Sequence, residues 1–287
     1  MGGEMKAISF YSVKGGTGRS LALANVATYM ANKGKRVLCI DLDIQAPGLY
    51  ALFEIPMEAR EKGRTIVDIL LSKDQLPDMR VVDVSEYLNV PQNCLFVIPT
   101  FPMSRDELLK FQRQSKDIWA SGYFATITDR FLKPLCALKN IEYIFIDSRS
   151  GIVEEAMVAL TLTGFLAQKT LCLLFTRLDT QSRKATYHAL TLFDQYQYDI
   201  PTKVVISNIP MGEKEFKLTM GEFRFNSKAY DILIEFDKEV KKLGKEIIVS
   251  IPFDEHYLLE HKIITVEERD MPLYNSYKML AEYIEKI

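Results

Sequence analysis

The chain has 287 residues, of which 48% are hydrophobic and 26% charged, so it can bury the core of one large α/β domain or two small ones. Its formal net charge of −2 argues against a general polyanion binder, although a local basic patch can exist within a nearly neutral total. No apolar run approaches the roughly 20 residues that span a bilayer, and the first residues, Met-Gly-Gly-Glu-Met, do not form a signal peptide.

The four cysteines form no C-x-x-C pair, and the three histidines show no metal-ligand spacing. Cys39 and Cys172 lie inside apolar, strand-like runs, and the other two are Cys94 and Cys136. We therefore expect buried, reduced thiols in a cytoplasmic protein.

The first part of the chain predicts a strand, a glycine-rich loop, a helix and a second strand. Residues 7–11 form a short apolar run typical of a buried strand, and the apolar positions of 21–30 follow helical spacing. Residues 36–40 predict the second strand. Two carboxylates, Asp41 and Asp43, follow it at a spacing of two, so we expect them to point to the same side.

The middle of the chain predicts two short helices and a third strand, at 65–71, 81–88 and 94–98. A capping box formed by Ser104 and Glu107 marks the start of a helix that runs to about Ala120. A further helical pattern covers 124–138, where Pro134 should kink or split the helix.

The second half of the chain predicts alternating strands and helices. Strands are expected at 141–146, 170–175, 203–206 and 246–251. Helices are expected at 152–162, 182–196, 225–243 and 273–287. This alternation is typical of a mostly parallel, twisted sheet with helices on both faces. No Gly/Ser-rich linker or repeat interrupts it, so we predict a single three-layer α/β domain over 1–287, with a helical or loop insert at 55–140.

Several polar and glycine residues fall at the carboxyl ends of the predicted strands, where ligands bind in folds of this kind. They are the glycine loop, Asp41 and Asp43, Asp147 and Gly151, Asn208, and Pro252 with Asp254. Because the strands are expected to be parallel, these residues should share one edge of the sheet and form one site.

The stretch Ser12-Val-Lys-Gly-Gly-Thr-Gly-Arg-Ser20 connects the first predicted strand to the first helix. Its three glycines let backbone N–H groups turn inward around an anion, and the helix N-terminus adds free N–H groups and partial positive charge. The stretch departs from the standard phosphate-loop pattern G-x-x-x-x-G-K-[ST] at two positions, Val13 and Arg19.

A phosphoryl-transfer site needs amides around the phosphates, a hydroxyl and carboxylates around Mg²⁺, and a group that places the attacking water. The loop would bind the phosphates through Gly15, Gly16, Thr17, Gly18, Arg19, Ser20 and Leu21. Ser20 can ligate Mg²⁺, and Asp147 can accept a hydrogen bond from a metal-bound water. Asp43 is a candidate for the metal and for orienting the attacking water, and Asp41 would lie behind these ligands.

The segment Lys14-Gly-Gly-Thr-Gly-Arg-Ser20 resembles the deviant Walker A motif K-G-G-x-G-K-[ST] of the MinD/ParA family of P-loop ATPases. Asp41-Leu-Asp43 resembles the family's switch I, and Asp147-Ser-Arg-Ser-Gly151 resembles its Walker B and switch II segments. Ser207-Asn208 and Ile251-Pro252, followed by Asp254, resemble the segments that hold the adenine. The resemblance covers about residues 5–286 and implies ATP and Mg²⁺ as ligands and an ATP-dependent homodimer.

The resemblance also implies a role for Lys14, because the early lysine of the loop in this family crosses a dimer interface to the phosphates of the other subunit. Arg19 replaces the family's usual lysine with a bulkier, planar and forked cation. Arg19 either bridges the phosphates and supports slow turnover, or allows ATP binding without useful hydrolysis, or abolishes binding. The chain resembles a family branch with this arginine and D-S-R-[ST]-G at switch II. Arg149 in that segment contacts phosphate, the partner subunit or solvent.

Family members differ in what they attach to. DNA binding needs several phosphate contacts, but the basic residues at 238–245 are interspersed with acids. The last helix has mixed charges, and its apolar positions fit packing on the sheet rather than on a membrane. Tyr274, Tyr277 and Tyr283 resemble the tail of bacterial tyrosine kinases, but their helical spacing indicates core contacts. Nitrogenase-like iron proteins need cysteines at the dimer axis, which the strand positions of Cys39 and Cys172 do not provide.

The sequence therefore predicts an ATP- and Mg²⁺-dependent dimerising switch of the MinD/ParA type, with slow hydrolysis and an unidentified protein partner. The alternative is a nucleotide-bound interaction or sensor subunit of a larger assembly, with little or no hydrolysis.

Overall fold

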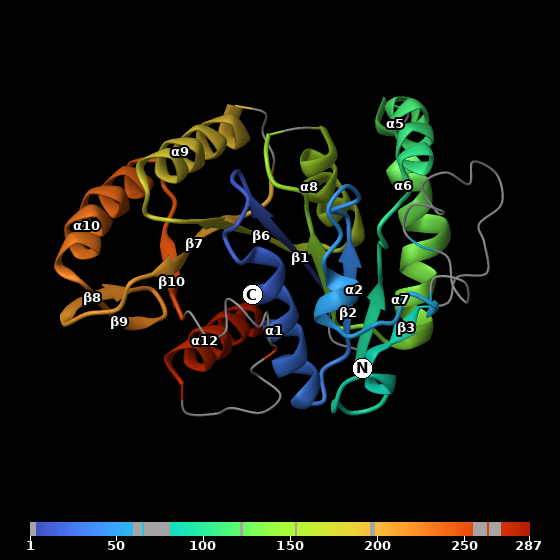
Figure 1. Ribbon diagram of the computed structural model, residues 1–287, viewed down its shortest axis with the longest axis horizontal. Helices are drawn as coiled ribbons and strands as arrows, with labels where there is room; N and C mark the ends of the chain where they lie inside the picture. The colour runs from blue at the N-terminus through green and yellow to red at the C-terminus, as the bar shows by residue number, and fades with distance from the viewer. Residues whose placement is uncertain are drawn as a thin grey trace.

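A mostly parallel sheet forms the centre of the molecule. The computed structural model describes residues 4–59, 65, 81–120, 123–152, 154–195, 199–254, 263 and 271–287. Within these residues the main sheet has eight strands in the order β10-β7-β6-β1-β5-β2-β4-β3 (Figure 1). The strands are β1 (Lys6–Ser12), β2 (Val37–Asp41), β3 (Val82–Asp83), β4 (Leu95–Ile98), β5 (Tyr143–Asp147), β6 (Lys169–Thr176), β7 (Thr202–Ile209) and β10 (Ile247–Pro252). Strand β3 at the edge is antiparallel to β4, and the other pairings in this sheet are parallel.

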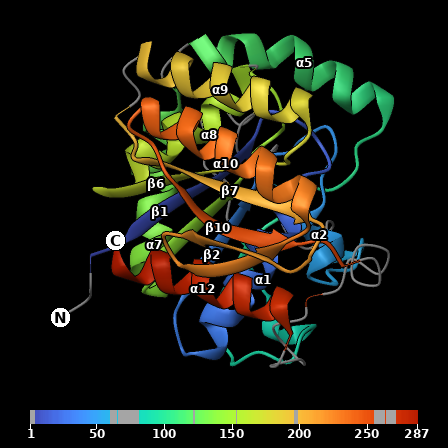
Figure 2. The ribbon, with the colours of Figure 1, turned by 90° about the vertical axis from the view of Figure 1, so that its left-hand side faces the viewer.

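Helices cover both faces of this sheet, and Figure 2 shows the resulting three layers in side view. One face carries α1 (Arg19–Asn32), α2 (Leu49–Leu52) and α12 (Pro272–Lys286). The other carries α5 (Arg105–Ala120), α6 (Tyr123–Ile127), α7 (Lys133–Lys139), α8 (Glu154–Leu166), α9 (Thr180–Gln195) and α10 (Ser227–Lys242). The central strands β2 and β5 are buried along their whole length, as expected for a sheet with both faces covered. The predicted fold class is therefore confirmed.

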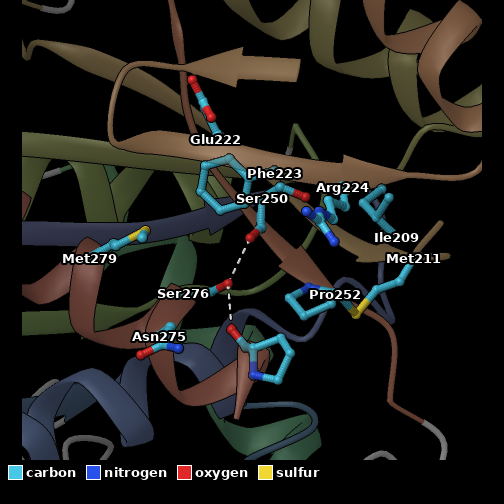
Figure 3. A pocket seen from close by; sticks show the side chains of 11 residues that line it. Ile209, Met211, Glu222, Phe223, Arg224, Ser250, Pro252, Asn275, Ser276 and Met279 are labelled. Atoms are coloured by element: carbon cyan, nitrogen blue, oxygen red, sulfur yellow. Dashed lines mark hydrogen bonds between the residues drawn. The ribbon is translucent and has the colours of Figure 1, made fainter. Parts of the chain in front are cut away.

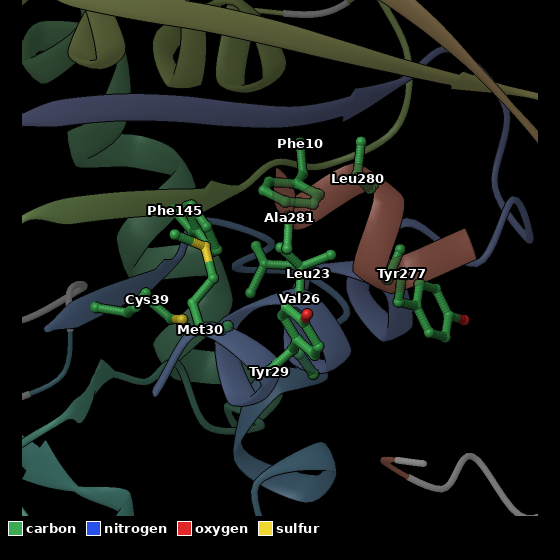
Figure 4. Close-up of a cluster of buried hydrophobic side chains, with 14 of the residues drawn as sticks. Phe10, Leu23, Val26, Tyr29, Met30, Cys39, Phe145, Tyr277, Leu280 and Ala281 are labelled. Atoms are coloured by element: carbon green, nitrogen blue, oxygen red, sulfur yellow. The ribbon is translucent and has the colours of Figure 1, made fainter. Parts of the chain in front are cut away.

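The last helix is part of the hydrophobic core. Tyr277, Leu280 and Ala281 of α12 are buried in the same cluster as Leu23 and Met30 of α1, and Figure 4 shows Ala281 lying next to Leu23. The start of the chain reinforces this contact, because the Lys6 ammonium donates to the Glu285 carbonyl oxygen at 2.7 Å. The apolar positions of the last helix therefore pack on the sheet, as predicted. No helix among the described residues is long and apolar enough to cross a membrane.

The boundaries of several elements test the sequence patterns. The capping box before α5 is confirmed, because Ser104 N donates to Glu107 Oε2 at 2.7 Å and Glu107 N donates to Ser104 Oγ at 3.3 Å. The expected interruption near Pro134 is also confirmed, since a π-helical segment, η2 (Thr128–Leu132), separates α6 from α7. The expected helix at 65–71 lies outside the described residues, apart from Thr65.

The helix expected at 81–88 is wrong. This segment forms the short strand β3 followed by a single 3₁₀ turn, η1 (Val84–Glu86). The Asp83 side chain accepts hydrogen bonds from Ser85 N and Asn93 N, each at 3.0 Å. These local bonds compete with helix formation and end the strand in a turn.

The sequence patterns missed a hairpin between β7 and α10, formed by β8 (Lys214–Leu218) and β9 (Gly221–Phe225). The strand expected at 203–206 runs on to Ile209, and the helix expected from Phe225 begins at Ser227. Asn226 caps that helix by accepting from Ala229 N at 2.8 Å. A signal for the hairpin existed, because charged and apolar residues alternate over 214–225 with Gly221 at the turn.

Candidate functional site

The glycine loop between β1 and α1 lines a cavity at the carboxyl edge of the sheet. Gly16 and Gly18 both have φ of +71°, a backbone conformation that other residues rarely adopt. The cavity has a volume of about 680 Å³. Its lining comprises Ser12, Gly15, Gly16, Thr17, Gly18, Arg19, Ser20, Leu21, Asp43, Ala46, Gly48, Ala51, Leu52 and Ser150. All seven residues predicted to surround the phosphates therefore line one cavity.

Neighbouring strand ends tie this loop down. The Asn208 side-chain amide donates to the Gly16 carbonyl oxygen at 3.1 Å, across 192 positions of sequence. On the other side, Gly151 N donates to the Ser12 carbonyl oxygen at 3.1 Å, and the Tyr11 hydroxyl donates to the Gly151 carbonyl oxygen at 2.5 Å. The tertiary structure thus places Asn208 and Gly151 beside the loop, as their positions at strand ends predict.

Arg19 is the first residue of α1, and its side chain is 7% exposed. Its Nε donates to Asp147 Oδ1 at 2.6 Å, its Nη1 donates to Ser12 Oγ at 3.2 Å, and its Nη2 donates to Asp43 Oδ2 at 3.3 Å. A guanidinium holds its donors on a rigid fork and can bond three groups at once, whereas a lysine ammonium is a compact point charge. Arg19 therefore joins the ends of β1 and β5 to the segment that follows β2.

Asp41, the last residue of β2, is fully buried and supports the backbone of the next segment. It accepts hydrogen bonds from Asp43 N at 3.0 Å, Gly48 N at 3.3 Å and Leu49 N at 3.2 Å. Burial, and then the neighbouring Asp147 charge, raise the pKa of Asp41 well above its usual value. Asp41 thus holds the cavity wall from behind and does not line the cavity itself.

Asp43 lines the cavity and is the more accessible of the two carboxylates, with 15% of its side chain exposed. It accepts from Ala46 N at 3.3 Å in addition to Arg19. Burial raises the pKa of Asp43, and the adjacent Arg19 cation partly opposes that shift. A half-buried carboxylate at the cavity wall is suited to orient a water molecule or to approach a metal ion.

The residues expected to hold Mg²⁺ fit such an ion. Ser20 lines the cavity, and Asp147 Oδ2 is a buried acceptor for which no hydrogen-bond partner exists among the described residues. A buried orphan acceptor is costly unless a donor such as a metal-bound water reaches it. Among the described residues, no three histidine, cysteine or acidic side chains gather closely enough to hold a metal by themselves. Mg²⁺ would therefore be held jointly by Ser20, water and the phosphates of a nucleotide.

Lys14 is exposed in the loop. Pro252 and Asp254 are not among the residues that line the loop cavity. Pro252 instead lines a second cavity of about 280 Å³ between the β8–β9 hairpin and α12 (Figure 3). The Phe253 N–H donates to the Ile209 carbonyl oxygen at 2.8 Å, so the two segments expected to hold adenine do lie side by side.

The sequence patterns missed the cavity wall opposite the loop. It is formed by α2 and the residues before it, of which Ala46, Gly48, Ala51 and Leu52 line the cavity. The Thr100 hydroxyl also supports this wall by donating to the Asp41 carbonyl oxygen at 2.8 Å. The segment has the Pro-Gly signature of a turn, but nothing in its sequence shows that the turn folds over the loop.

The lysines considered for DNA binding and the cysteines considered for an iron–sulfur cluster have other surroundings in the structure. On α10, Lys241 pairs with Asp237 at 2.6 Å, and Lys245 beyond its end pairs with Asp194 at 3.0 Å. Lys238 and Lys242 lie close in the sequence to the acidic residues Asp237 and Glu239. The four cysteines are free thiols, of which Cys39, Cys136 and Cys172 are buried and Cys94 is partly buried. The predicted burial is therefore confirmed for three of the four thiols and is only partial for Cys94.

The chain is similar in sequence and in fold to several known proteins. The AAA domain family model matches residues 5–118. An uncharacterized ATP-binding protein of Methanocaldococcus jannaschii is 24% identical over 288 residues, covering 99% of this chain and 87% of that protein. The cell division ATPase MinD of Pyrococcus furiosus superposes with a TM-score of 0.65 at 18% identity, covering 100% of this chain and 99% of that one. A variant of McdA from Cyanothece in complex with ATP superposes with a TM-score of 0.69 at 15% identity, covering 99% and 97%.

The parallel sheet, with the glycine loop at its carboxyl edge, is a P-loop fold. The chain shares this fold, over nearly its whole length, with MinD and with a ParA family ATPase. The resemblance inferred from the loop motifs is therefore confirmed at the level of the fold.

Proposed function

We propose that this protein is an ATP- and Mg²⁺-dependent dimerising switch with slow ATP hydrolysis, acting in the cytoplasm with a protein partner. The observation that carries the proposal is the single cavity of about 680 Å³ lined by the glycine loop, Ser20, Arg19 and Asp43. Backbone amides, a hydroxyl, a cation and a carboxylate converge there, and these are the parts that phosphoryl transfer requires. The ATP complex of the McdA variant, which shares this fold, supports ATP as the ligand.

Each residue has a distinct role in the proposal. The amides of Gly15, Gly16 and Gly18 bind the phosphates, and Ser20 would hold Mg²⁺, which would supply positive charge beside the phosphate oxygens. Asp43 orients the attacking water. Lys14 is exposed and so is free to reach the phosphates of a second subunit.

The alternative is a nucleotide-binding interaction or sensor subunit with little or no hydrolysis. One observation favours this alternative: Arg19 forms ion pairs with both Asp43 and Asp147. If the arginine keeps these bonds after ATP binds, neither carboxylate is free to place water or metal-bound water. Nucleotide binding and dimerisation could then persist without turnover.

The test measures molecular mass in solution, with and without saturating ATP and Mg²⁺, together with phosphate release. We expect wild type to become a dimer with ATP and to release phosphate slowly. Lys14→Ala and Asp43→Ala should each reduce phosphate release by at least about tenfold, which corresponds to about 1.4 kcal/mol of transition-state stabilisation. Lys217→Ala, which removes an exposed lysine on the hairpin, is the matched control and should behave as wild type.

The outcomes separate the two functions. A wild-type protein that stays monomeric at saturating ATP contradicts the dimerising switch. A dimer whose phosphate release equals that of Asp43→Ala supports the interaction subunit instead. Failure of the wild-type protein to bind nucleotide would contradict both the dimerising switch and the interaction subunit.

A further inference from the structure

Arg19 and a bound metal ion require the same two carboxylates. The guanidinium is hydrogen-bonded to Asp147 Oδ1 at 2.6 Å and to Asp43 Oδ2 at 3.3 Å. Under the proposed function, these are also the carboxylates that face Mg²⁺ and its water ligands. Two cations a few ångströms apart repel each other, most strongly where water is excluded. We therefore expect the Arg19 guanidinium and Mg²⁺ to compete for Asp43 and Asp147, so that only one of the two cations occupies this position at a time.

The three carboxylates around Arg19, those of Asp41, Asp43 and Asp147, need a compensating positive charge. Asp41 and Asp147 are fully buried at the paired ends of β2 and β5, and Asp43 lies next to them. Three carboxylates share this place with Arg19. A buried carboxylate that loses its cationic partner is strongly destabilising unless another positive charge or a proton replaces it. Displacement of Arg19 must therefore be accompanied by a second cation or by protonation of a carboxylate, and Mg²⁺ is the cation that arrives with a nucleotide.

The Arg19 side chain borders the cavity in which the phosphates would bind. Arg19 itself lines the loop cavity, together with Ser12 and Asp43, which it contacts. Its backbone is fixed at the first turn of α1, directly after the glycine loop. A guanidinium pairs with phosphate in a bidentate way, so phosphates in the cavity offer it partners as good as the carboxylates. Because Arg19 lines the same cavity as the glycine loop, phosphates bound by that loop would lie next to its side chain.

We propose that Arg19 is a cation lock on the metal-binding carboxylates, holding Asp43 and Asp147 in the nucleotide-free protein and releasing them to Mg²⁺ when phosphates draw its guanidinium into the loop. The proposal rests on the proposed function, in which nucleotide and Mg²⁺ bind together. It also explains why an arginine stands here, since a lysine ammonium would not span Ser12, Asp43 and Asp147 together. Arg19 is thus a positioning residue for the carboxylates before it becomes a phosphate ligand.

The test uses the full-length protein freed of nucleotide, so it does not depend on dimerisation or hydrolysis. Thermal unfolding is recorded with and without Mg²⁺, and bound Mn²⁺ is counted by electron paramagnetic resonance. Wild type should bind no Mn²⁺ and show no shift of its unfolding midpoint with Mg²⁺. Arg19→Gln leaves Asp43 and Asp147 without their cation, so these two carboxylates, together with the Ser20 hydroxyl and water, become available to a metal ion. The variant should unfold at a lower temperature than wild type, bind one Mn²⁺ and regain several degrees when Mg²⁺ is added.

Arg36→Gln is the matched control, because Arg36 donates to the Lys139 carbonyl oxygen far from the cavity. It should lose some stability and show no response to Mg²⁺. If Arg19→Gln does not fold, Arg19→Lys replaces it; a lysine cannot bond Ser12, Asp43 and Asp147 together, so the variant should gain thermal stability with Mg²⁺ where wild type gains none. The proposal is overturned if the Arg19 variant ignores Mg²⁺ and Mn²⁺, or if nucleotide-free wild type binds Mn²⁺ as tightly as the variant does. A failure of ATP-dependent dimerisation would leave these results unchanged and so is distinguishable.

Discussion

The side-chain amide of Asn208 donates to the Gly16 carbonyl oxygen at 3.1 Å, which ties the glycine loop to the end of β7. Asn208 also has a left-handed backbone, with φ of 56°. Asn208→Gly removes the side-chain donor while keeping that backbone unstrained. We expect nucleotide affinity to fall by up to about tenfold, because a hydrogen bond of this kind contributes about 0.5–1.5 kcal/mol. Titration with a fluorescent nucleotide would measure the change.

The control for that change is Asn140→Gly. Asn140 has φ of 52° at the end of α7, so this substitution makes the same backbone change away from the loop. Affinity should stay at the wild-type value. Equal losses in both variants would show that chain flexibility, and not the bond to Gly16, determines nucleotide affinity.

Gly212 marks a close approach between the start of the hairpin and its end. A Cβ atom at this position would lie 2.5 Å from the backbone N and Cα of Asn226. Backbone cannot move aside as a flexible side chain can, so Gly212→Ala should lower the free energy of unfolding by about 2–3 kcal/mol. Urea unfolding would measure this. Gly164→Ala inside α8 is the control, where the nearest atom is a side-chain carbon 3.9 Å away, and stability should stay equal or rise.

Leu280 tests whether α12 is a core helix. It is fully buried in the cluster that joins α12 to α1, so Leu280→Ala should cost about 2–5 kcal/mol of unfolding free energy. Lys278→Ala, at an exposed position on the same helix, should change it by less than about 0.5 kcal/mol. Equal unfolding curves for the two variants would mean that α12 does not pack on the sheet in solution.

Glu246 joins β7 and the hairpin just before β10. Its carboxylate lies 2.5 Å from the Lys203 ammonium and accepts from the Thr219 hydroxyl at 2.8 Å. The hydrogen bond from Lys203 lowers the pKa of Glu246 below its usual value. A carboxylate with a lowered folded-state pKa adds stability above its unfolded pKa of about 4.3, and that stability is lost as the pH falls through the folded value.

Glu246→Gln should therefore reduce stability by up to about 1 kcal/mol at pH 7, because the pair is partly exposed and screened. The difference from wild type should shrink as the pH falls below about 4. Urea unfolding between pH 3 and pH 7 would record it. Asp129→Asn, in the exposed pair with Lys133 at 2.8 Å, is the control and should give a small difference at pH 7. A difference for Glu246→Gln that grew as the pH fell would contradict the assignment.

The sheet and most of its helices could be predicted because their signals are local. Strands such as β5 and β6 are nearly continuous apolar runs, and the Ser104 capping box marks the first turn of α5. The hairpin was missed because its alternation is short and flanked by charged residues. The segment at 81–88 was misread because Asp83 bonds to nearby backbone N–H groups and ends the strand in a turn.

For the candidate site, too, local patterns predicted some features and the tertiary structure decided the others. The sequence by itself determined the glycine loop and placed Asp41, Asp43, Asp147 and Asn208 at strand ends, because periodicity and glycine spacing report local backbone geometry. Only the tertiary structure decided what those residues contact. Arg19 reads as a phosphate ligand in the sequence, yet its guanidinium lies on Asp43 and Asp147, which are 24 and 128 positions away. Such contacts depend on how strands from distant parts of the chain align in one sheet, and no local pattern encodes that alignment.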